Sequence, residues 1–439
     1  MKRIAKKLKN NTLSPLFGLI TKISSTIIEV QGLNPGISDI VEIVREHDSS
    51  SELGMVTEVR GEKFYISPFG FIEGFKVGDK VFLNNSGLSI PVCDDLLGRV
   101  VDPFMRPKDG GDILRKTKLM PIMKPPIEAM KRGIIDTTFS VGVKSIDGLL
   151  TCGKGQKMGI FAGSGVGKST LMGMIVKGSN APIKIVALIG ERGREVPEFI
   201  QKNLNNDLSD TVIVVATSDD SPLMRKYGAF AAMSVAEYFK EQGRDVLFIM
   251  DSITRFAMAQ REIGLALGEP PTSKGYPPSV LSLLPQLMER AGKEDGKGSI
   301  TAFFTVLVEG DDLSDPIADQ SRSILDGHIV LSREMTDFGI YPPIDILKSA
   351  SRVMNDIVKD KHKFAAITFK KLYSILKDNE VLIRIGAYQK GTDKELDFAI
   401  DKKRDMEEFL KQPPAVLEEY ENIVDNLINI IERRENERL

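Results

Sequence analysis

The chain has 439 residues, more than one compact core usually holds, so two or three domains are expected. Its 59 basic and 61 acidic residues nearly balance, which argues against a protein whose whole surface binds nucleic acid but leaves a local basic patch open. Two cysteines far apart and three scattered histidines supply no disulfide framework and no metal-ligand spacing, as suits a reducing cytoplasm.

The first fifteen residues form a basic segment that begins MKRIAKKLKNN and lacks the apolar core of a signal peptide. Two interpretations fit this segment. It is either a solvated basic tail or a short amphipathic helix, with Ile4 and Leu8 on one face, that binds a partner or anionic lipid. No apolar run in the chain approaches the roughly 18 residues that a membrane span needs.

Residues 16–92 alternate short β-branched or aromatic runs with Gly, Asn and Pro turns every eight to twelve residues, a spacing that predicts a small barrel or sandwich domain. Residues 93–136 are punctuated by proline and glycine. Because proline suits neither helix nor central strand, we expect an ordered connector without regular strands there.

The segment from 93 to 355, which includes this connector, is predicted to be an α/β domain. Continuous Val/Ile/Leu-rich runs alternate with helical stretches from about residue 137, which indicates a mainly parallel sheet covered on both faces. The expected strands are 157–162, 183–189, 211–216, 245–250, 300–308 and 328–331, with a helix over 222–243. Residues 356–439 form a predicted helical domain, ending in a helix after Pro414 whose apolar stripe comprises Leu417, Tyr420, Val424, Leu427 and Ile431.

The stretch FAGSGVGKST lies between an apolar strand and a helical run, the context of a P-loop. Its glycines allow backbone N–H groups to point at phosphate oxygens, and the helix N-terminus adds partial positive charge. Lys168 reaches the β- and γ-phosphates in such a loop, and the Ser169 hydroxyl binds Mg²⁺. Ala162 stands where the usual pattern opens with glycine, a mild change. The predicted nucleotide-binding residues are Gly163, Ser164, Gly165, Val166, Gly167, Lys168, Ser169 and Thr170.

Two acidic residues follow other predicted strands. Asp251 ends the run VLFIMD, where α/β sheets place ligands, and is the expected second metal ligand. Glu191, in IGERGREV, follows the strand 183–189. A carboxylate at that position suits orienting or deprotonating the attacking water; the alternative is a surface ion pair with Arg194, which would contribute about 0–1 kcal/mol.

These motifs carry a family resemblance. AGSGVGKST, GERGREV, LFIMDSITRFA and GEPPTSKGYPPSV, in this order, resemble the catalytic subunits of rotary ATPases, as does YPPIDILKSASRVM. The strings SVGVKSIDGLLTCGKGQ and SDDSPLMRKYGAF are narrower and resemble the type III secretion ATPases, most closely those of flagellar protein export. The resemblance is densest over 95–355 and implies a RecA-like P-loop NTPase core, preceded by a β-barrel and followed by helices.

The resemblance also assigns roles. It makes Glu191 the catalytic carboxylate, Arg192 its phosphate-side neighbour and Asp251 the Walker-B aspartate. Arg352 falls on the arginine that reaches into the neighbouring subunit's site; a structural arginine is the alternative. Phe364 is predicted to lie near the adenine, although the helix register there leaves the position open.

The implied protein is a cytoplasmic Mg-dependent ATPase that hydrolyses ATP and associates peripherally with the inner-membrane export apparatus. The implied partners are a regulator or stator protein, a central stalk, the export gate and chaperone–substrate complexes, with no nucleic acid. An arginine acting in trans implies an oligomer, by resemblance a homohexamer, and the Pro-rich loop 268–279 would face the central stalk.

Alternative functions share parts of this pattern. A virulence type III secretion ATPase differs from a flagellar one by no single residue. The catalytic subunit of a proton-translocating ATP synthase shares Lys168, Glu191 and Asp251, but not the two narrower strings. An RNA translocase shares the GER motif, yet residues 16–92 are not markedly basic. A scaffold without activity would not need Lys168, Glu191 and Asp251 to be intact.

Overall fold

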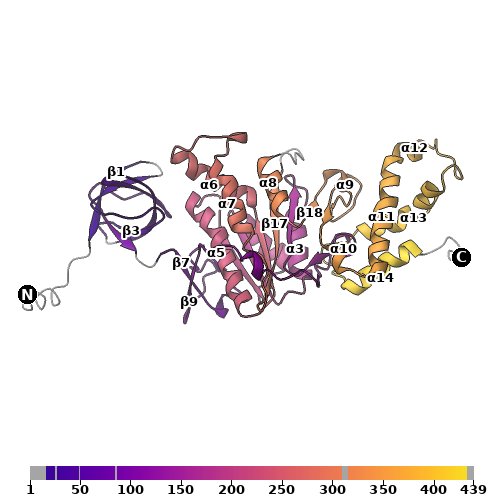
Figure 1. Cartoon of the computed structure of the whole chain (residues 1–439), viewed down its shortest axis with the longest axis horizontal. Helices are drawn as coiled ribbons and strands as arrows, with labels where there is room; N and C mark the ends of the chain where they lie inside the picture. The colour runs from indigo at the N-terminus through magenta and orange to yellow at the C-terminus, as the bar shows by residue number, and fades with distance from the viewer. Residues whose placement is uncertain (1–15, 25–26, 49, 85–86, 309–314, 433–439) are drawn as a thin grey trace, which may run out of the picture.

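The computed structural model describes residues 16–432 except 25–26, 49, 85–86 and 309–314; the basic segment 1–15 and its two interpretations lie outside the described residues. Three regions follow one another along the longest axis of the molecule: a barrel, a layered sheet and a group of helices (Figure 1). In the described part of the chain, helices long enough to span a bilayer are too polar, and the apolar ones are too short.

The N-terminal region is a closed barrel with the strand order β1-β2-β5-β4-β3-β6. Its inward side chains alternate with outward ones, as in Phe64 and Ile66, which are buried on either side of the partly exposed Tyr65. Of the two architectures that the turn spacing predicts, the structure therefore shows the barrel and not the sandwich. The strands are β1 (Phe17–Ile23), β2 (Ile28–Gln31), β3 (Ile40–Val44), β4 (Ser51–Arg60), β5 (Lys63–Pro68) and β6 (Lys80–Asn84).

The connector contains regular strands, so the expectation of none over 93–136 is wrong. β8 (Val100–Val101) pairs with β14 (Thr211–Ala216) at the edge of the central sheet. β9 (Lys118–Pro121) pairs with β7 (Ser89–Val92) in a separate two-stranded sheet. Both are edge pairings, where a proline that lacks an N–H donor is tolerated. Two short 3₁₀ turns, Asp94–Leu96 and Ala129–Lys131, also lie here.

The central sheet has the strand order β19-β18-β12-β17-β15-β13-β14-β8 and is mainly parallel, as predicted. The exceptions are β19 (Ala350–Ser351) at one edge and β16 (Gly292–Lys293), which pairs antiparallel with β17. The other strands are β12 (Lys157–Ala162), β13 (Ile183–Ile189), β15 (Val246–Asp251), β17 (Ser299–Leu307) and β18 (Gly327–Val330). β10 (Thr138–Phe139) and β11 (Cys152–Gly153) form a small separate pair.

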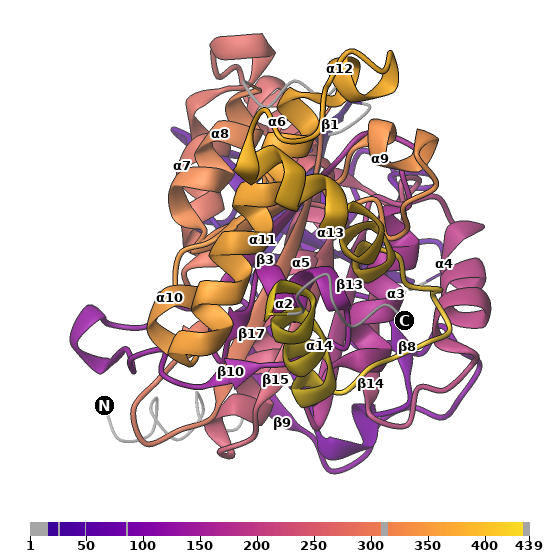
Figure 2. The ribbon, with the colours of Figure 1, turned by 90° about the vertical axis from the view of Figure 1, so that its right-hand side faces the viewer.

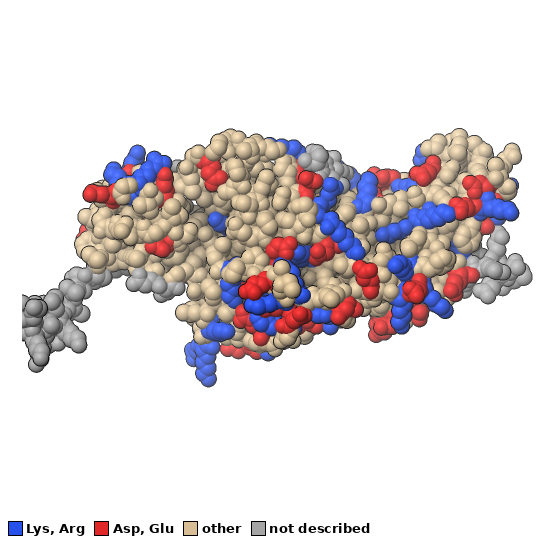
Figure 3. Space-filling model, in the orientation of Figure 1, with Lys and Arg blue, Asp and Glu red and all other residues tan. Residues whose placement is uncertain are grey.

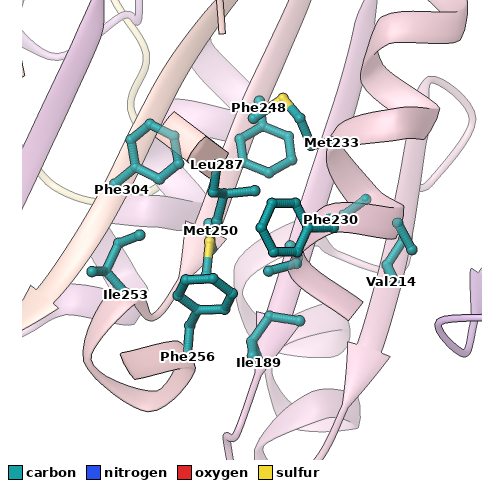
Figure 4. Close-up of a cluster of buried hydrophobic side chains, with 14 of the residues drawn as sticks. Ile189, Val214, Phe230, Met233, Phe248, Met250, Ile253, Phe256, Leu287 and Phe304 are labelled. Atoms are coloured by element: carbon teal, nitrogen blue, oxygen red, sulfur yellow. The ribbon is translucent and has the colours of Figure 1, made fainter. Parts of the chain in front are cut away.

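Helices cover both faces of this sheet, which explains its continuous apolar strands. On β15, Phe248 and Met250 pack on one side, and Leu247 and Ile249 on the other. Figure 4 shows the first side, where Phe230 approaches the strands. The helices on that side are α5 (Pro222–Glu241), α6 (Ile253–Ala266), α7 (Pro278–Met288) and α8 (Pro316–Ile324). The last two residues of the Pro-rich loop 268–279 are the first residues of α7.

The opposite side carries α2 (Lys144–Leu149), α3 (Lys168–Gly178), α9 (Arg333–Asp337), α10 (Met354–Ile357) and the C-terminal helices. These C-terminal helices are α11 (Asp360–Asp378), α12 (Glu380–Arg384), α13 (Lys394–Leu410) and α14 (Tyr420–Glu432). Of these, α11, α13 and α14 pack against α2, over which they lie in the end-on view of Figure 2. His362 of α11 bonds through Nε2 to the Gly148 carbonyl at 2.7 Å, so α2 is the platform on which these helices dock.

The apolar stripe of the last helix lies in a different register from the one predicted. α14 begins at Tyr420, and its buried residues are Ile423, Leu427, Ile430 and Ile431. Leu417 precedes the helix and is 42% exposed. Leu427 and Ile431 are buried as predicted, but Tyr420 and Val424 are only partly buried, so the buried face is rotated toward Ile423 and Ile430.

Candidate active site

The site lies at the carboxyl ends of the parallel strands, as in other α/β sheets. β12 runs into the P-loop, and α3 begins at Lys168. Gly165 and Gly167 have φ of 77° and 97°, a left-handed conformation that glycine adopts without strain. This turn directs the N-terminus of α3 toward the space above the sheet, where its N–H groups favour an anion.

Lys168 lies between the two predicted carboxylates. Its Nζ is 3.4 Å from Glu191 Oε1 and also donates to Asp251 Oδ1. Asp251 Oδ1 accepts a second hydrogen bond from Thr305 Oγ1 at 2.7 Å. Burial alone would lower the pKa of Lys168, but the charges of Asp251 and Glu191 outweigh it and raise that pKa, so the ammonium stays charged.

Glu191 follows a turn that only glycine fits well. Gly190 has a φ of 74°, and a Cβ there would lie 2.7 Å from Arg255 Cβ. Burial raises the pKa of Glu191; the Lys168 charge opposes the shift and the Asp251 charge adds to it. In the described residues the ion-pair partner of Glu191 is Lys168, while Arg194 is exposed, so the surface-pair alternative has no support in the geometry.

A cavity of about 920 Å³ opens above these groups and collects most of the predicted site residues. Val166, buried beneath the loop, is absent from its lining. Arg192 lines the cavity with a side chain that is 67% exposed and lies 3.9 Å from Glu195. The predicted residues in the lining are Gly163, Ser164, Gly165, Gly167, Lys168, Ser169, Thr170, Glu191, Arg192 and Asp251.

Besides Val166, two predicted residues lie outside this cavity. Arg352 follows β19 at the sheet edge; its side chain is exposed, with Nη2 at 3.4 Å from the Arg322 carbonyl oxygen. Phe364 is 66% exposed on α11 and lines a separate hollow with Ile428 and Ile431 of α14. Within one chain, the fold brings neither residue to the phosphate loop.

The structure adds three residues that the sequence patterns did not single out. Arg255, one turn into α6, lines the cavity, and its Nε is buried with no hydrogen-bond partner in the described residues. Arg333 donates from Nη2 to the Ser164 carbonyl at 3.2 Å. The ring of Tyr341 lies 3.8 Å from where a Cβ on Gly167 would sit. The arginine of LFIMDSITRFA, four residues beyond Asp251, was the one available signal in the sequence.

The cavity holds the parts of a nucleoside triphosphate site. A glycine loop and a helix N-terminus lie along one wall, and a lysine, two carboxylates and the Arg255 guanidinium, whose Nε has no hydrogen-bond partner in the described residues, lie around the space where phosphates would sit. The Ser169 hydroxyl and the Asp251 carboxylate are hard oxygen donors of the type that Mg²⁺ prefers.

Family models match three consecutive parts of the chain. They are the "ATP synthase alpha/beta family, beta-barrel domain" at residues 20–82, the same family's "nucleotide-binding domain" at 142–351, and the "T3SS EscN ATPase C-terminal domain" at 358–429. These matches follow the order of barrel, sheet and helices.

Among relatives, the Flagellum-specific ATP synthase of Helicobacter pylori strain J99 is 64% identical over 97% of this chain and 99% of its own length. Among solved structures, the assembled ATPase EscN of the enteropathogenic E. coli type III secretion system has a TM-score of 0.89 at 44% identity, covering 94% of this chain and 100% of that one. EscN in complex with its central stalk EscO gives a TM-score of 0.88 at 43% identity, with the same coverage.

The agreement extends over the barrel, the nucleotide-binding core and the C-terminal helices, and it covers the relatives almost end to end. The chain is therefore an ATPase of the ATP synthase alpha/beta family and belongs to its flagellum-specific and type III secretion branch.

Proposed function

We propose that this chain is the ATP-hydrolysing motor of a flagellar protein export apparatus, coupling hydrolysis to chaperone release, unfolding and export of flagellar proteins. The observation that carries the proposal is its 64% identity to a flagellum-specific relative, against 44% to the type III secretion ATPase EscN. A virulence system is the second candidate. The match of 358–429 to a type III secretion C-terminal domain favours either over a proton-translocating ATP synthase.

The residues around the cavity suggest how hydrolysis proceeds. The P-loop N–H groups and Lys168 bind the β- and γ-phosphates and hold the γ-phosphoryl group in line with a water. Glu191, buried beside that position, orients this water and accepts its proton. Ser169 and Asp251 would hold Mg²⁺, which neutralises phosphate charge when bound. Arg192 and Arg255, which both line the cavity, supply further positive charge there.

Arg352 completes this scheme only if a second copy of the chain contributes it. Its exposed guanidinium at the sheet edge is available to a neighbour, where it would neutralise charge developing on the transferring phosphoryl group. A homohexameric ring, in which every interface is a site, satisfies this requirement. The similarity to EscN in its assembled form supports such an assembly.

The proposed partners follow the same comparison. EscN binds a central stalk, EscO, and we expect the loop 268–279 to face an equivalent stalk here. The other proposed partners are a regulator or stator protein, the export gate and chaperone–substrate complexes. We propose that the chain is cytoplasmic and docks peripherally at the inner-membrane export apparatus. On the face shown in Figure 3, basic and acidic side chains intermingle, so that face offers no continuous basic path for a nucleic-acid strand.

The base of the nucleotide has a suitable neighbour in Tyr341. Tyr341 is 42% exposed and its ring lies beside Gly167, where an aromatic face can stack on adenine. Phe364, the residue predicted for this contact, lies on α11 and lines a separate hollow, away from the phosphate loop of the same chain.

Two measurements test the proposal. ATP turnover per chain should rise with protein concentration, because a site shared between copies needs assembly; turnover independent of concentration would contradict the shared site. Purification of the tagged chain from its own cells should bring flagellar export components with it. Recovery of ATP synthase subunits instead would overturn the assignment to export.

A further inference from the structure

Gln156 is a completely buried polar residue that immediately precedes β12. Its side-chain Oε1 accepts a hydrogen bond from the Gly153 N–H at 2.8 Å. Its Nε2 donates to the Asp326 carbonyl oxygen and to Ser351 Oγ, each at 3.1 Å. A buried amide whose oxygen and nitrogen are both bonded is held in one orientation.

The two acceptors of Gln156 Nε2 are the groups that fix the backbone of Arg352. The Arg352 N–H donates to the Asp326 carbonyl at 2.9 Å, so Arg352 and Gln156 share this acceptor. Ser351, the other acceptor, is the residue directly before Arg352. In the part of the chain that the structure describes, the exposed Arg352 side chain makes one long hydrogen bond, 3.4 Å from Nη2 to the Arg322 carbonyl oxygen. The direction of its guanidinium therefore depends on how firmly its backbone is held.

The same contacts fix the amino end of the strand that leads to the P-loop. Asp326, just before β18, donates its N–H to the Lys157 carbonyl at 2.9 Å, and its Oδ2 accepts from the Lys157 N–H at 3.0 Å. Lys157 is the first residue of β12, whose carboxyl end runs into the phosphate loop. Gln156 itself is absent from the lining of the cavity. It can therefore influence catalysis by two indirect routes, along β12 or through Arg352.

We propose that Gln156 is a positioning residue for Arg352, holding the backbone around that arginine so that its guanidinium reaches the site of a neighbouring copy. The inference rests on the proposed function, in which Arg352 acts in trans. Three side-chain bonds of Gln156 carry the proposal, two of them to groups that adjoin or bind the Arg352 backbone. A residue that served only packing would lower stability without regard to which copy carries the substitution.

The first test is a double-mutant cycle. Gln156→Met keeps the length of the side chain and removes its hydrogen bonds. We expect kcat to fall by about tenfold, with the KM for ATP changed by less than about twofold, because Arg352 is present but poorly placed. In the Arg352→Ala background the same substitution should change kcat by less than about twofold, because no guanidinium is left to position. Equal fold-losses in the two backgrounds would overturn the proposal.

The second test asks which copy is affected, by mixing equal amounts of Gln156→Met and Glu191→Gln. Random assembly gives about a quarter of the interfaces an intact cavity from the first variant and a well-placed Arg352 from the second. Activity per chain should then be about two- to threefold that of Gln156→Met alone. If Gln156 acted along β12 on the cavity of its own copy, the mixture would have about half the activity of Gln156→Met alone, which would contradict the proposal.

Ser349→Ala is the matched control. Ser349 is also buried beside β18, where its Oγ donates to the Asp345 carbonyl at 2.6 Å and accepts from the Val330 N–H at 2.9 Å. Neither partner bonds to the Arg352 backbone, so kcat should stay within about twofold of the wild type. A loss equal to that of Gln156→Met would show that any buried bond at this edge has the same effect, and would overturn the proposal.

If Gln156→Met does not fold, Ser351→Ala takes its place in both tests. It removes one of the two acceptors of Gln156 Nε2, so kcat should fall by about threefold, and by less than about twofold in the Arg352→Ala background. An unchanged kcat in this variant would overturn the proposal. Full activity of Arg352→Ala would instead remove the trans-acting arginine from the proposed function, a result that the single variants of Gln156 and Ser351 cannot produce.

Discussion

Two groups of buried charges lie at opposite ends of the central sheet. At the amino end, Arg290 is completely buried, and Glu289 beside it pairs with Lys157, the first residue of β12. Arg290 donates from Nε and Nη2 to the Glu237 carboxylate at 2.7 and 2.8 Å, and from Nη1 to the Ile122 carbonyl at 2.7 Å. Its fourth bond goes to Ser234 Oγ at 2.8 Å.

The group at the carboxyl end is built from similar residues but is not saturated. Lys168 lies between Glu191 and Asp251, Arg255 has a buried Nε without a partner in the described residues, and burial raises the pKa of Glu191. A saturated group of charges specifies packing, whereas an unsaturated one favours a ligand that supplies the missing partners. Substitutions should therefore reduce stability at the first end and activity at the second.

The largest effect is expected for Glu191→Gln. The amide keeps the shape of the side chain but cannot accept the proton of the attacking water, so kcat should fall by about 10⁴-fold, to the limit of detection. Folding should not suffer, because the raised pKa of Glu191 shows that its surroundings already disfavour the carboxylate. Steady-state kinetics and thermal unfolding check the two parts, and near-normal turnover would remove Glu191 from the mechanism.

Arg352→Ala should lower kcat by about 10³-fold while leaving nucleotide affinity nearly intact, because the arginine acts on charge that develops during the reaction. Kinetics together with equilibrium binding of a fluorescent ATP analogue would separate the two quantities. A large loss of affinity would instead indicate a structural role.

Mixing this variant with Glu191→Gln tests whether the arginine acts in trans. If sites form between copies, random assembly of equal amounts restores about a quarter of the interfaces, each with an intact Glu191 and an intact Arg352. Activity should then reappear in the mixture of two inactive proteins. A mixture as inactive as its components would place Arg352 outside the neighbouring site.

At the saturated end, Arg290→Met should lower the free energy of unfolding by about 3–5 kcal/mol, because it leaves the Glu237 carboxylate buried without its partner. Urea unfolding measures this change. The double variant with Glu237→Leu should recover much of the loss, and the KM for ATP of folded protein should stay unchanged. A single variant with normal stability would contradict the role assigned to this group.

The sequence predicts the site where its chemistry is local. The P-loop is contiguous, and Glu191 and Asp251 each follow an apolar strand, so parallel pairing alone brings them together. Tyr341 and Arg333 escaped prediction because their partners in the P-loop, Gly167 and Ser164, lie far away in the chain.

The fold divides in the same way. The strand runs of the core are visible as patterns, and their predicted positions agree closely with the structure, while the turn spacing of residues 16–92 indicates the barrel. β8 has two residues, and its pairing with β14 at the edge of the sheet defines it as a strand. The buried face of α14 likewise depends on the residues against which the helix packs. Tertiary contacts, not local propensity, decide such elements.

The smallest effect in this comparison is that of pH. Burial, reinforced by Asp251 and opposed by Lys168, raises the pKa of Glu191 above its ordinary 4.5. The mechanism needs the ionised carboxylate, so kcat/KM should fall as pH is lowered, with a midpoint above 4.5. Turnover measured across pH, with nucleotide affinity followed in parallel, checks this prediction.

The control is Glu191→Asp, which keeps an ionisable group in the same surroundings. Its residual activity should retain the acid limb, whereas any residual turnover of Glu191→Gln should lack it. The same limb in Glu191→Gln would assign the titration to another group.

Since a raised pKa in the folded state makes protonation favour folding, protonation of Glu191 in mild acid should lower activity without destabilising this end of the sheet. Function and stability then respond oppositely to the same proton, as expected of a charge group that is left unsaturated for its ligand.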